Sequence, residues 1–88
     1  MVSEQGGRDY GLQVNMKTQD IFKSRLLMLK RERHWSYPDM AKLSDLPLST
    51  IKAYVFKDRE PGIYSLAKMS RGFGVTADWL IGLKEERD

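Results

Sequence analysis

Residues 37–57, YPDMAKLSDLPLSTIKAYVFK, limit the possible folds more than any other stretch of the chain. Asp45, Leu46 and Pro47 break this stretch, because the residue before a proline avoids the helical conformation. Each side of the break has room for only about two or three helical turns. The stretch therefore predicts two short helices joined by a tight turn, with the functional surface on the polar side of the second helix.

Local signals set the ends of these two helices. Ser36 is expected to cap the helix before the break, with Asp39 three residues further on in an arrangement close to a capping box, and this helix is expected to stop near Ser44. The second helix is expected over residues 48–56. Its Ile51 is spaced by three from Tyr54, so both side chains are expected to face the core.

Three more helices are predicted on either side of this pair. Counted along the whole chain, the first helix has a cap at Thr18 or Asp20 and ends near His34. The fourth covers residues 63–72, with Gly74 as its left-handed terminal residue, and the fifth covers residues 77–83 after a Thr76 cap. The inward positions are expected at Phe22, Leu26, Leu29, Met40, Ala41, Leu43, Leu66, Met69, Phe73, Trp79 and Leu80.

A chain of 88 residues has room for one domain, and a domain this small buries only about 60% of its unfolded surface. A compact helical core is expected, and a large catalytic cleft is not. The predicted organisation is a flexible N-terminal arm over residues 1–17, a helical domain over residues 18–83, and a charged tail over residues 84–88 that frays.

The positive charge is concentrated in the middle of the chain. Residues 17–71 carry a net +6, whereas residues 1–16 carry −1 and residues 72–88 carry −2, within a total of +3. A basic centre suits a polyanionic partner, although charge alone fits an ordinary solvated face equally well.

Several classes of function are not expected. The chain has no cysteine and a single histidine, so no disulfide, no metal site and no cofactor is predicted. It shows no constellation of a nucleophile and a base and no glycine-rich phosphate loop, which argues against an enzyme. Without a long apolar run or a signal peptide, the sequence predicts a soluble, cytoplasmic protein that does not contact a membrane.

Three segments carry a family resemblance: RLLMLKRERHWSYPDMAKLS, LPLSTIKAYV and SLAKMSRGFGVTADWLIG. The last segment is the most specific of the three. Together they resemble the lambda-repressor-like helix-turn-helix family, also called the Cro/CI or XRE type, over residues 22–82. The resemblance implies an all-α fold of five helices in which the helix at residues 48–56 enters the major groove of double-stranded DNA.

The resemblance also implies which residues touch DNA. Base readout falls to Leu48, Ser49, Lys52, Ala53 and Phe56. Phosphate contact falls to Tyr37, Thr50, Lys57 and Arg59. Leu48 and Ala53 can contact a thymine methyl group, and Ser49 can exchange a hydrogen bond with a base. The hydroxyl group of Tyr37 is expected to bond a phosphate with help from nearby backbone amides.

The chain departs from the family pattern at three positions. Leu48 stands where a glutamine or arginine is frequent, so shape and methyl contacts are expected to carry more of the specificity. Val55 replaces a glutamate that would pair with Lys30, which predicts an apolar contact there. Pro47 stands where a serine or threonine usually caps the recognition helix.

The leading functional hypothesis is a sequence-specific DNA-binding transcriptional regulator, most simply a repressor. It would bind a two-fold operator as a homodimer. The dimer surface is expected at Trp79, Ile81 and Leu83, and no small-molecule effector site is expected. The alternative is a protein-interaction module of antitoxin or anti-repressor type, which would grip another protein with its N-terminal arm.

Overall fold

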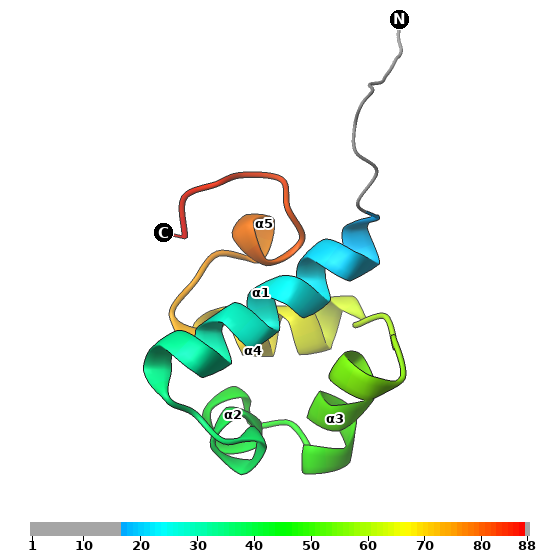
Figure 1. Ribbon diagram of the computed structural model, residues 1–88, viewed down its shortest axis with the longest axis vertical. Helices are drawn as coiled ribbons and strands as arrows, with labels where there is room; N and C mark the ends of the chain where they lie inside the picture. The colour runs from blue at the N-terminus through cyan, green and yellow to red at the C-terminus, as the bar shows by residue number, and fades with distance from the viewer. Residues whose placement is uncertain (1–16, 88) are drawn as a thin grey trace, which may run out of the picture.

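The computed structural model describes residues 17–87 and contains five helices and no strand within that range (Figure 1). The all-α class predicted from the sequence is confirmed. The expected N-terminal arm lies outside the described residues, except for residue 17. The helices are α1 (Thr18–Arg33), α2 (Tyr37–Ser44), α3 (Leu48–Phe56), α4 (Ile63–Phe73) and α5 (Ala77–Leu80).

Helix α1 runs across the molecule from one end to the other. Helices α2 and α3 lie together at one end, α5 and the C-terminal residues lie at the other end, and α4 passes behind α1 (Figure 1). Helix α2 packs on both α3 and α4, and α1 packs on α3 and on α5. Helix α1 therefore connects the helix-turn-helix end of the molecule to its C-terminal end.

Every helix contributes apolar side chains to one core. The fully buried apolar residues are Phe22, Leu26, Leu29, Met40, Ile51, Tyr54, Met69, Phe73 and Leu80. Helices α2 and α4 approach so closely that a Cβ atom on Gly72 would overlap the backbone carbonyl of Leu43. Only glycine fits at this crossing, and the crossing fixes α2 against the rest of the fold.

The inner side of α2 differs from the prediction. Leu43 was expected to face inward, but its side chain is 43% exposed, and Ser44 is buried in its place. The Ser44 hydroxyl donates to the Met40 carbonyl at 2.7 Å, so this polar group is satisfied inside its own helix. A small self-satisfied residue suits the narrow space where α2 meets α4.

Most of the predicted helix ends are confirmed, and two are wrong. Ser36 and Asp39 form the capping box of α2, and Gly74 ends α4 with φ of 72°. Helix α1 begins after Lys17 without a side-chain cap, rather than with a cap from Thr18 or Asp20. Helix α5 ends at Leu80, about one turn earlier than predicted.

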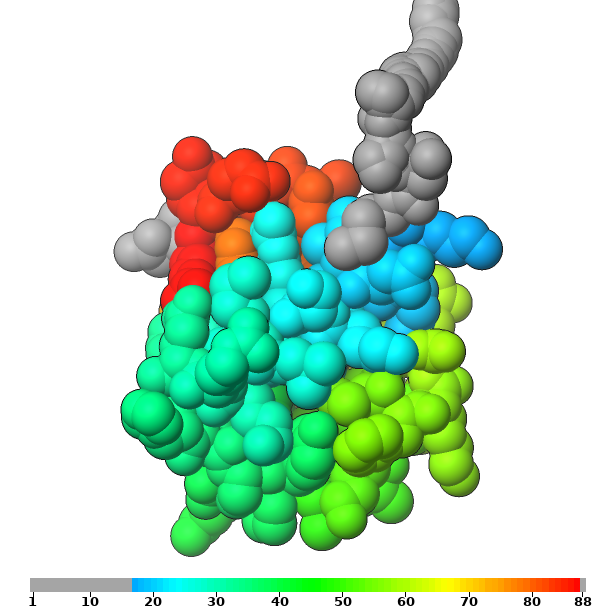
Figure 2. Space-filling view, viewed as in Figure 1, coloured from blue at the N-terminus to red at the C-terminus, as the bar shows by residue number. Residues whose placement is uncertain are grey.

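The residues after α5 make hydrogen bonds with the rest of the fold as far as Arg87, whereas the sequence predicted a tail that frays. We call residues 81–87 the C-terminal segment; it folds back against α1 (Figure 2). The Arg87 guanidinium donates to both carboxylate oxygens of Glu32, at 2.6 and 2.7 Å. The Thr76 N–H donates to the Arg87 carbonyl at 2.6 Å, which closes the segment onto the start of α5.

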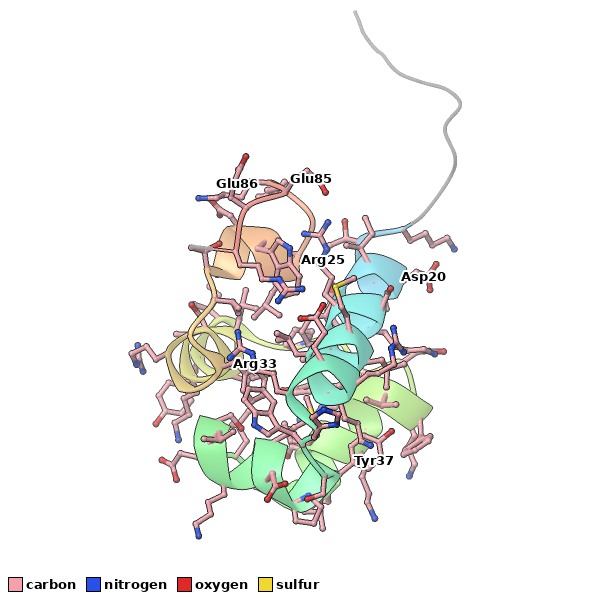
Figure 3. All side chains as sticks on the ribbon, turned by 60° about the vertical axis from the view of Figure 1, so that its left-hand side comes forward. Asp20, Arg25, Arg33, Tyr37, Glu85 and Glu86 are labelled. Atoms are coloured by element: carbon pink, nitrogen blue, oxygen red, sulfur yellow. The ribbon has the colours of Figure 1, made fainter. Side chains whose placement is uncertain are left out.

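Arg25 holds the same segment from the middle of α1. Its guanidinium donates to the carbonyls of Trp79 at 2.6 Å and Lys84 at 3.0 Å. The guanidinium groups of Arg25 and Arg87 each lie 4.8 Å from the centroid of the Trp79 ring. Figure 3 shows Arg25 reaching from α1 toward α5, below the chain that carries Glu85. Trp79 is therefore the centre around which the C-terminal end is assembled.

Candidate nucleic-acid interface

Helix α3 has a buried side and an exposed side. Ile51, Tyr54 and Val55 are buried, and the side chains that point the other way remain accessible. At 100° per residue, the five positions predicted to read bases fall within one stripe about 140° wide. These positions are Leu48, Ser49, Lys52 and Phe56, which are exposed, and Ala53, which is half-buried. The structure thus brings all five predicted readout residues onto one face.

An aromatic contact connects this face to α2. The rings of Tyr37 and Phe56 meet edge to face, with centroids 5.5 Å apart and an interplanar angle of 69°. The Lys30 ammonium group lies 4.6 Å from the centroid of the Tyr37 ring. We call Lys30, Tyr37 and Phe56 the aromatic bridge. It joins the end of α1, the start of α2 and the end of α3.

The aromatic bridge gives Lys30 a partner in place of the glutamate that many members of the family have at the position of Val55. Val55, at the position of that partner, is only 6% exposed and packs in the core, as the sequence predicted. Lys30 instead covers the ring of Tyr37. This contact was not predicted, because no local pattern connects a lysine to an aromatic residue beyond the helix end.

The first turn of α2 offers fewer free donors than expected. The Ser36 hydroxyl accepts the Asp39 N–H at 3.1 Å, and the Asp39 carboxylate accepts the Ser36 N–H at 2.8 Å. The latter bond holds the pKa of Asp39 below its ordinary range. Pro38 has no N–H at all. A phosphate at Tyr37 would therefore depend mainly on side chains rather than on the helix amides.

The other predicted phosphate contacts differ in exposure. Lys57 and Arg59 are exposed on the loop over residues 57–62, which we call the α3–α4 loop. Thr50 is half-buried in the first turn of α3, where its N–H bonds the Pro47 carbonyl at 3.0 Å. The two basic side chains are thus the more accessible of these groups.

The turn between α2 and α3 is held from outside by α4. Asp45 adopts a left-handed conformation with φ of 58°, and the Leu46 N–H donates to the Ala41 carbonyl at 3.0 Å. Lys68 donates to the Asp45 carbonyl at 3.0 Å and to its carboxylate at 3.1 Å. The hydrogen bond to Asp45 raises the pKa of Lys68. The contact of Lys68 with the turn was not predicted, since 23 residues separate the two in the sequence.

The three residues predicted for a dimer surface have different environments. Trp79 is 3% exposed and belongs to the core, so the prediction that it faces a partner is not supported by its position. Ile81 is half-buried, and Leu83 is 72% exposed. Of the predicted set, Ile81 and Leu83 are the residues that a second chain can touch.

None of the helices within residues 17–87 is long and apolar enough to cross a lipid bilayer.

A helix-turn-helix family model matches residues 26–80, more than half of the chain. The chain belongs to the helix-turn-helix family. Within it, the chain is of the XRE, lambda-repressor-like type, which is a class of DNA-binding transcription regulators. Neither the search of curated proteins nor the search of solved structures gave a match.

Proposed function

We propose that this protein is a cytoplasmic transcriptional repressor that binds a two-fold DNA operator as a homodimer. The observation that carries the proposal is the division of α3 into two sides. Its buried residues fix the helix in the fold, and its exposed side presents small, polar and apolar groups together. A helix with one accessible side is suited to enter the major groove, which admits an α-helix.

Each residue of the exposed side has a chemical role in this proposal. Ser49 exchanges a hydrogen bond with a base edge, and Lys52 donates to a guanine or to a phosphate. Leu48, Ala53 and Phe56 contact thymine methyl groups, which are the apolar groups that base pairs present in the major groove. With three apolar residues among five, we expect the operator to be rich in thymine at the contacted positions.

The phosphate contacts surround this face. Tyr37 and Thr50 contact the DNA phosphate backbone beside α3. Lys57 and Arg59 contact it from the α3–α4 loop. These contacts carry no sequence information, but they set the register of the protein on the duplex and make affinity depend on salt.

The dimer would form at the other end of the molecule. Leu83 and Ile81 supply apolar surface there, and two α3 helices related by a two-fold axis would enter grooves about 34 Å apart, one turn of DNA.

Selection of bound duplexes from a random DNA pool tests the proposal. The expected result is a two-fold motif with half-sites one helical turn apart. Ser49→Ala should change the preference at one base position by about 1 to 3 kcal/mol. The matched control is Ser24→Ala, which removes the hydroxyl of an exposed serine on α1 and should leave the motif unchanged.

One outcome would favour a protein-interaction module instead. In that case no DNA sequence would be enriched, and a pull-down from the native cell would return one stoichiometric protein. An unchanged motif for Ser49→Ala, with a motif still selected, would contradict only the register assigned to α3.

A further inference from the structure

The α3–α4 loop has an unfavourable charge order for a segment that meets DNA. Asp58 lies between Lys57 and Arg59, the two cations proposed to contact phosphates. A free carboxylate at this place would repel the phosphate backbone and offset part of the attraction of its neighbours. The loop therefore needs a way to neutralise Asp58 and to turn it from the duplex.

The backbone of the loop makes a sharp reversal at Asp58. The backbone of this residue is in the left-handed region, with φ of 51°. Residues other than glycine, asparagine and aspartate rarely adopt this conformation. The reversal lets the Ala53 carbonyl accept two N–H groups, from Lys57 at 3.0 Å and from Arg59 at 3.2 Å. The backbone amides of both basic residues are thus tied to one carbonyl at the end of α3.

Helix α1 contacts this loop at two points. The Lys23 ammonium group lies 2.8 Å from the Asp58 carboxylate. The Gln19 side-chain amide donates to the Arg59 carbonyl at 3.0 Å. Gln19 and Lys23 are four residues apart, so they lie on the same side of α1 and reach the loop together. The hydrogen bond with Asp58 also raises the pKa of Lys23.

We infer that Lys23 and Gln19 are positioning residues that hold the α3–α4 loop in its phosphate-binding conformation. Lys23 neutralises Asp58 and fixes its side chain, and Gln19 fixes the backbone that carries Arg59. Neither residue touches DNA in this role. The inference rests on the proposed function, since it assigns a purpose to the loop only if Lys57 and Arg59 meet phosphates.

The exposure of these contacts favours a role in binding over a role in stability. The Lys23 side chain is 35% exposed and the Asp58 side chain is 64% exposed, and ion pairs with such access to solvent add little to folding. A loop ordered before binding, however, avoids the entropy cost of ordering it against DNA. Loss of the contacts should therefore weaken DNA binding measurably and leave the melting temperature nearly unchanged.

Fluorescence anisotropy with a selected operator duplex, between 50 and 200 mM salt, tests this inference. Lys23→Met, which keeps the apolar stem, should weaken binding about 3- to 10-fold, and Lys23→Arg should stay within about twofold of the wild type. The slope of log affinity against log salt should not change for Lys23→Met, because no phosphate contact is lost. Arg71→Met, which removes one exposed cation from the last turn of α4, is the control for net charge.

A double substitution shows whether Lys23 acts through Asp58. Asn tolerates the left-handed conformation and removes both the carboxylate and its ion pair with Lys23, so Asp58→Asn should bind more weakly than the wild type but more tightly than Lys23→Met, which leaves the carboxylate unpaired. In the Asp58→Asn background, Lys23→Met should then have almost no further effect on affinity. Gln19→Ala should weaken binding in either background, because it acts on the carbonyl of Arg59.

Each contrary outcome has a separate meaning. Equal affinity for Lys23→Met and Arg71→Met would overturn the inference while leaving the proposed function intact. A slope lowered by about 0.9 in Lys23→Met, with the same loss in the Asp58→Asn background, would make Lys23 a phosphate contact and would also overturn it. Wild-type protein that binds no duplex would overturn the proposed function, and this inference with it.

Discussion

Helix α1 holds two segments without helical structure, and it holds them in different ways. At the C-terminal end, Arg25 and Glu32 fix residues 81–87 through several hydrogen bonds and through contacts around a buried indole ring. At the other end, Gln19 and Lys23 fix the α3–α4 loop through one hydrogen bond and one exposed ion pair.

The contacts at the C-terminal end stabilise the fold, whereas those at the α3–α4 loop order the loop before it binds DNA. The Arg25 side chain is 14% exposed and surrounded by protein groups, so its loss would take a hydrogen bond from the carbonyls of both Trp79 and Lys84. The contacts at the α3–α4 loop are open to solvent. We therefore expect disruption of the C-terminal end to reduce stability and disruption of the loop end to reduce DNA affinity.

Trp79→Ala should have the largest effect, a loss of about 3 to 5 kcal/mol in the free energy of unfolding. The ring is 3% exposed, and its removal leaves a cavity and takes away the platform for Arg25 and Arg87. Urea unfolding measures the loss. Trp35→Ala is the matched control, because Trp35 is only half-buried against Phe73. Equal losses for the two variants would contradict a special importance of the C-terminal end.

Arg87→Ala should lower the melting temperature by about 4 to 8 °C and leave the affinity of the folded protein for a duplex with a single half-site within about twofold. The substitution removes both bonds to Glu32 and the contact with the Trp79 ring. Thermal unfolding and anisotropy at a low temperature measure the two effects. A large loss of affinity without a loss of stability would show that the two ends of the molecule are not independent.

Lys57→Ala should produce the opposite result, weaker binding to all duplexes with little change in melting temperature. Loss of one phosphate contact should flatten the salt slope by about 0.9, so that raising salt from 50 to 200 mM costs about threefold less affinity than in the wild type. Arg71→Ala, on the exposed last turn of α4, controls for charge. An unchanged slope would remove Lys57 from the proposed phosphate contacts.

Acid should weaken the C-terminal end through Glu32. The hydrogen bonds from Arg87 hold the pKa of Glu32 below its ordinary value of 4.5. A carboxylate with a lowered pKa stabilises the fold above its unfolded pKa, and this contribution disappears as the pH falls through its folded pKa. The melting temperature of the wild type should therefore exceed that of Glu32→Gln at neutral pH, and the difference should close below pH 4.5. A difference that persisted in acid would show that the Glu32 charge is not its source.

Alkali should release the α3–α4 loop, with the smallest effect on stability. Asp58 raises the pKa of Lys23 above its ordinary value of 10.5. The stabilisation is complete below the unfolded pKa and is lost as the pH rises through the folded pKa. The difference in melting temperature between the wild type and Lys23→Met should stay constant up to about pH 10 and close at higher pH. A difference that closed near neutral pH would contradict this ion pair.

Features that depend on neighbouring residues were predictable from the sequence. The bounds of α3, the capping box at Ser36 and the left-handed Gly74 each follow from contacts within one or two helical turns. The outward stripe of α3 was predictable for the same reason, because the positions of Ile51 and Tyr54 fix the phase of the whole helix.

Features that depend on distant residues were not predictable in this way. Arg87 meets Glu32 across 55 positions, and Lys23 meets Asp58 across 35. Hydrophobic periodicity contains no information about charged pairs at such separations, so a charged C-terminus was interpreted as loose. The burial of Ser44 rather than Leu43 also has a distant cause. Helix α4 approaches α2 at Gly72 and leaves little room there for a large side chain.

The two-sided structure of α3 also bears on how such a regulator can acquire new targets. Ser49 and Lys52 are exposed and take no part in the core, so their replacement should leave the fold intact. With Ser49 and Lys52 reading bases as proposed, a gene duplicate could therefore change its preferred sequence by single substitutions at these positions, without passing through an unfolded intermediate. Phe56 is less free to vary, because its ring also packs on Tyr37. Divergence of DNA preference in a lineage of such proteins should begin at Ser49 and Lys52 and reach Phe56 last.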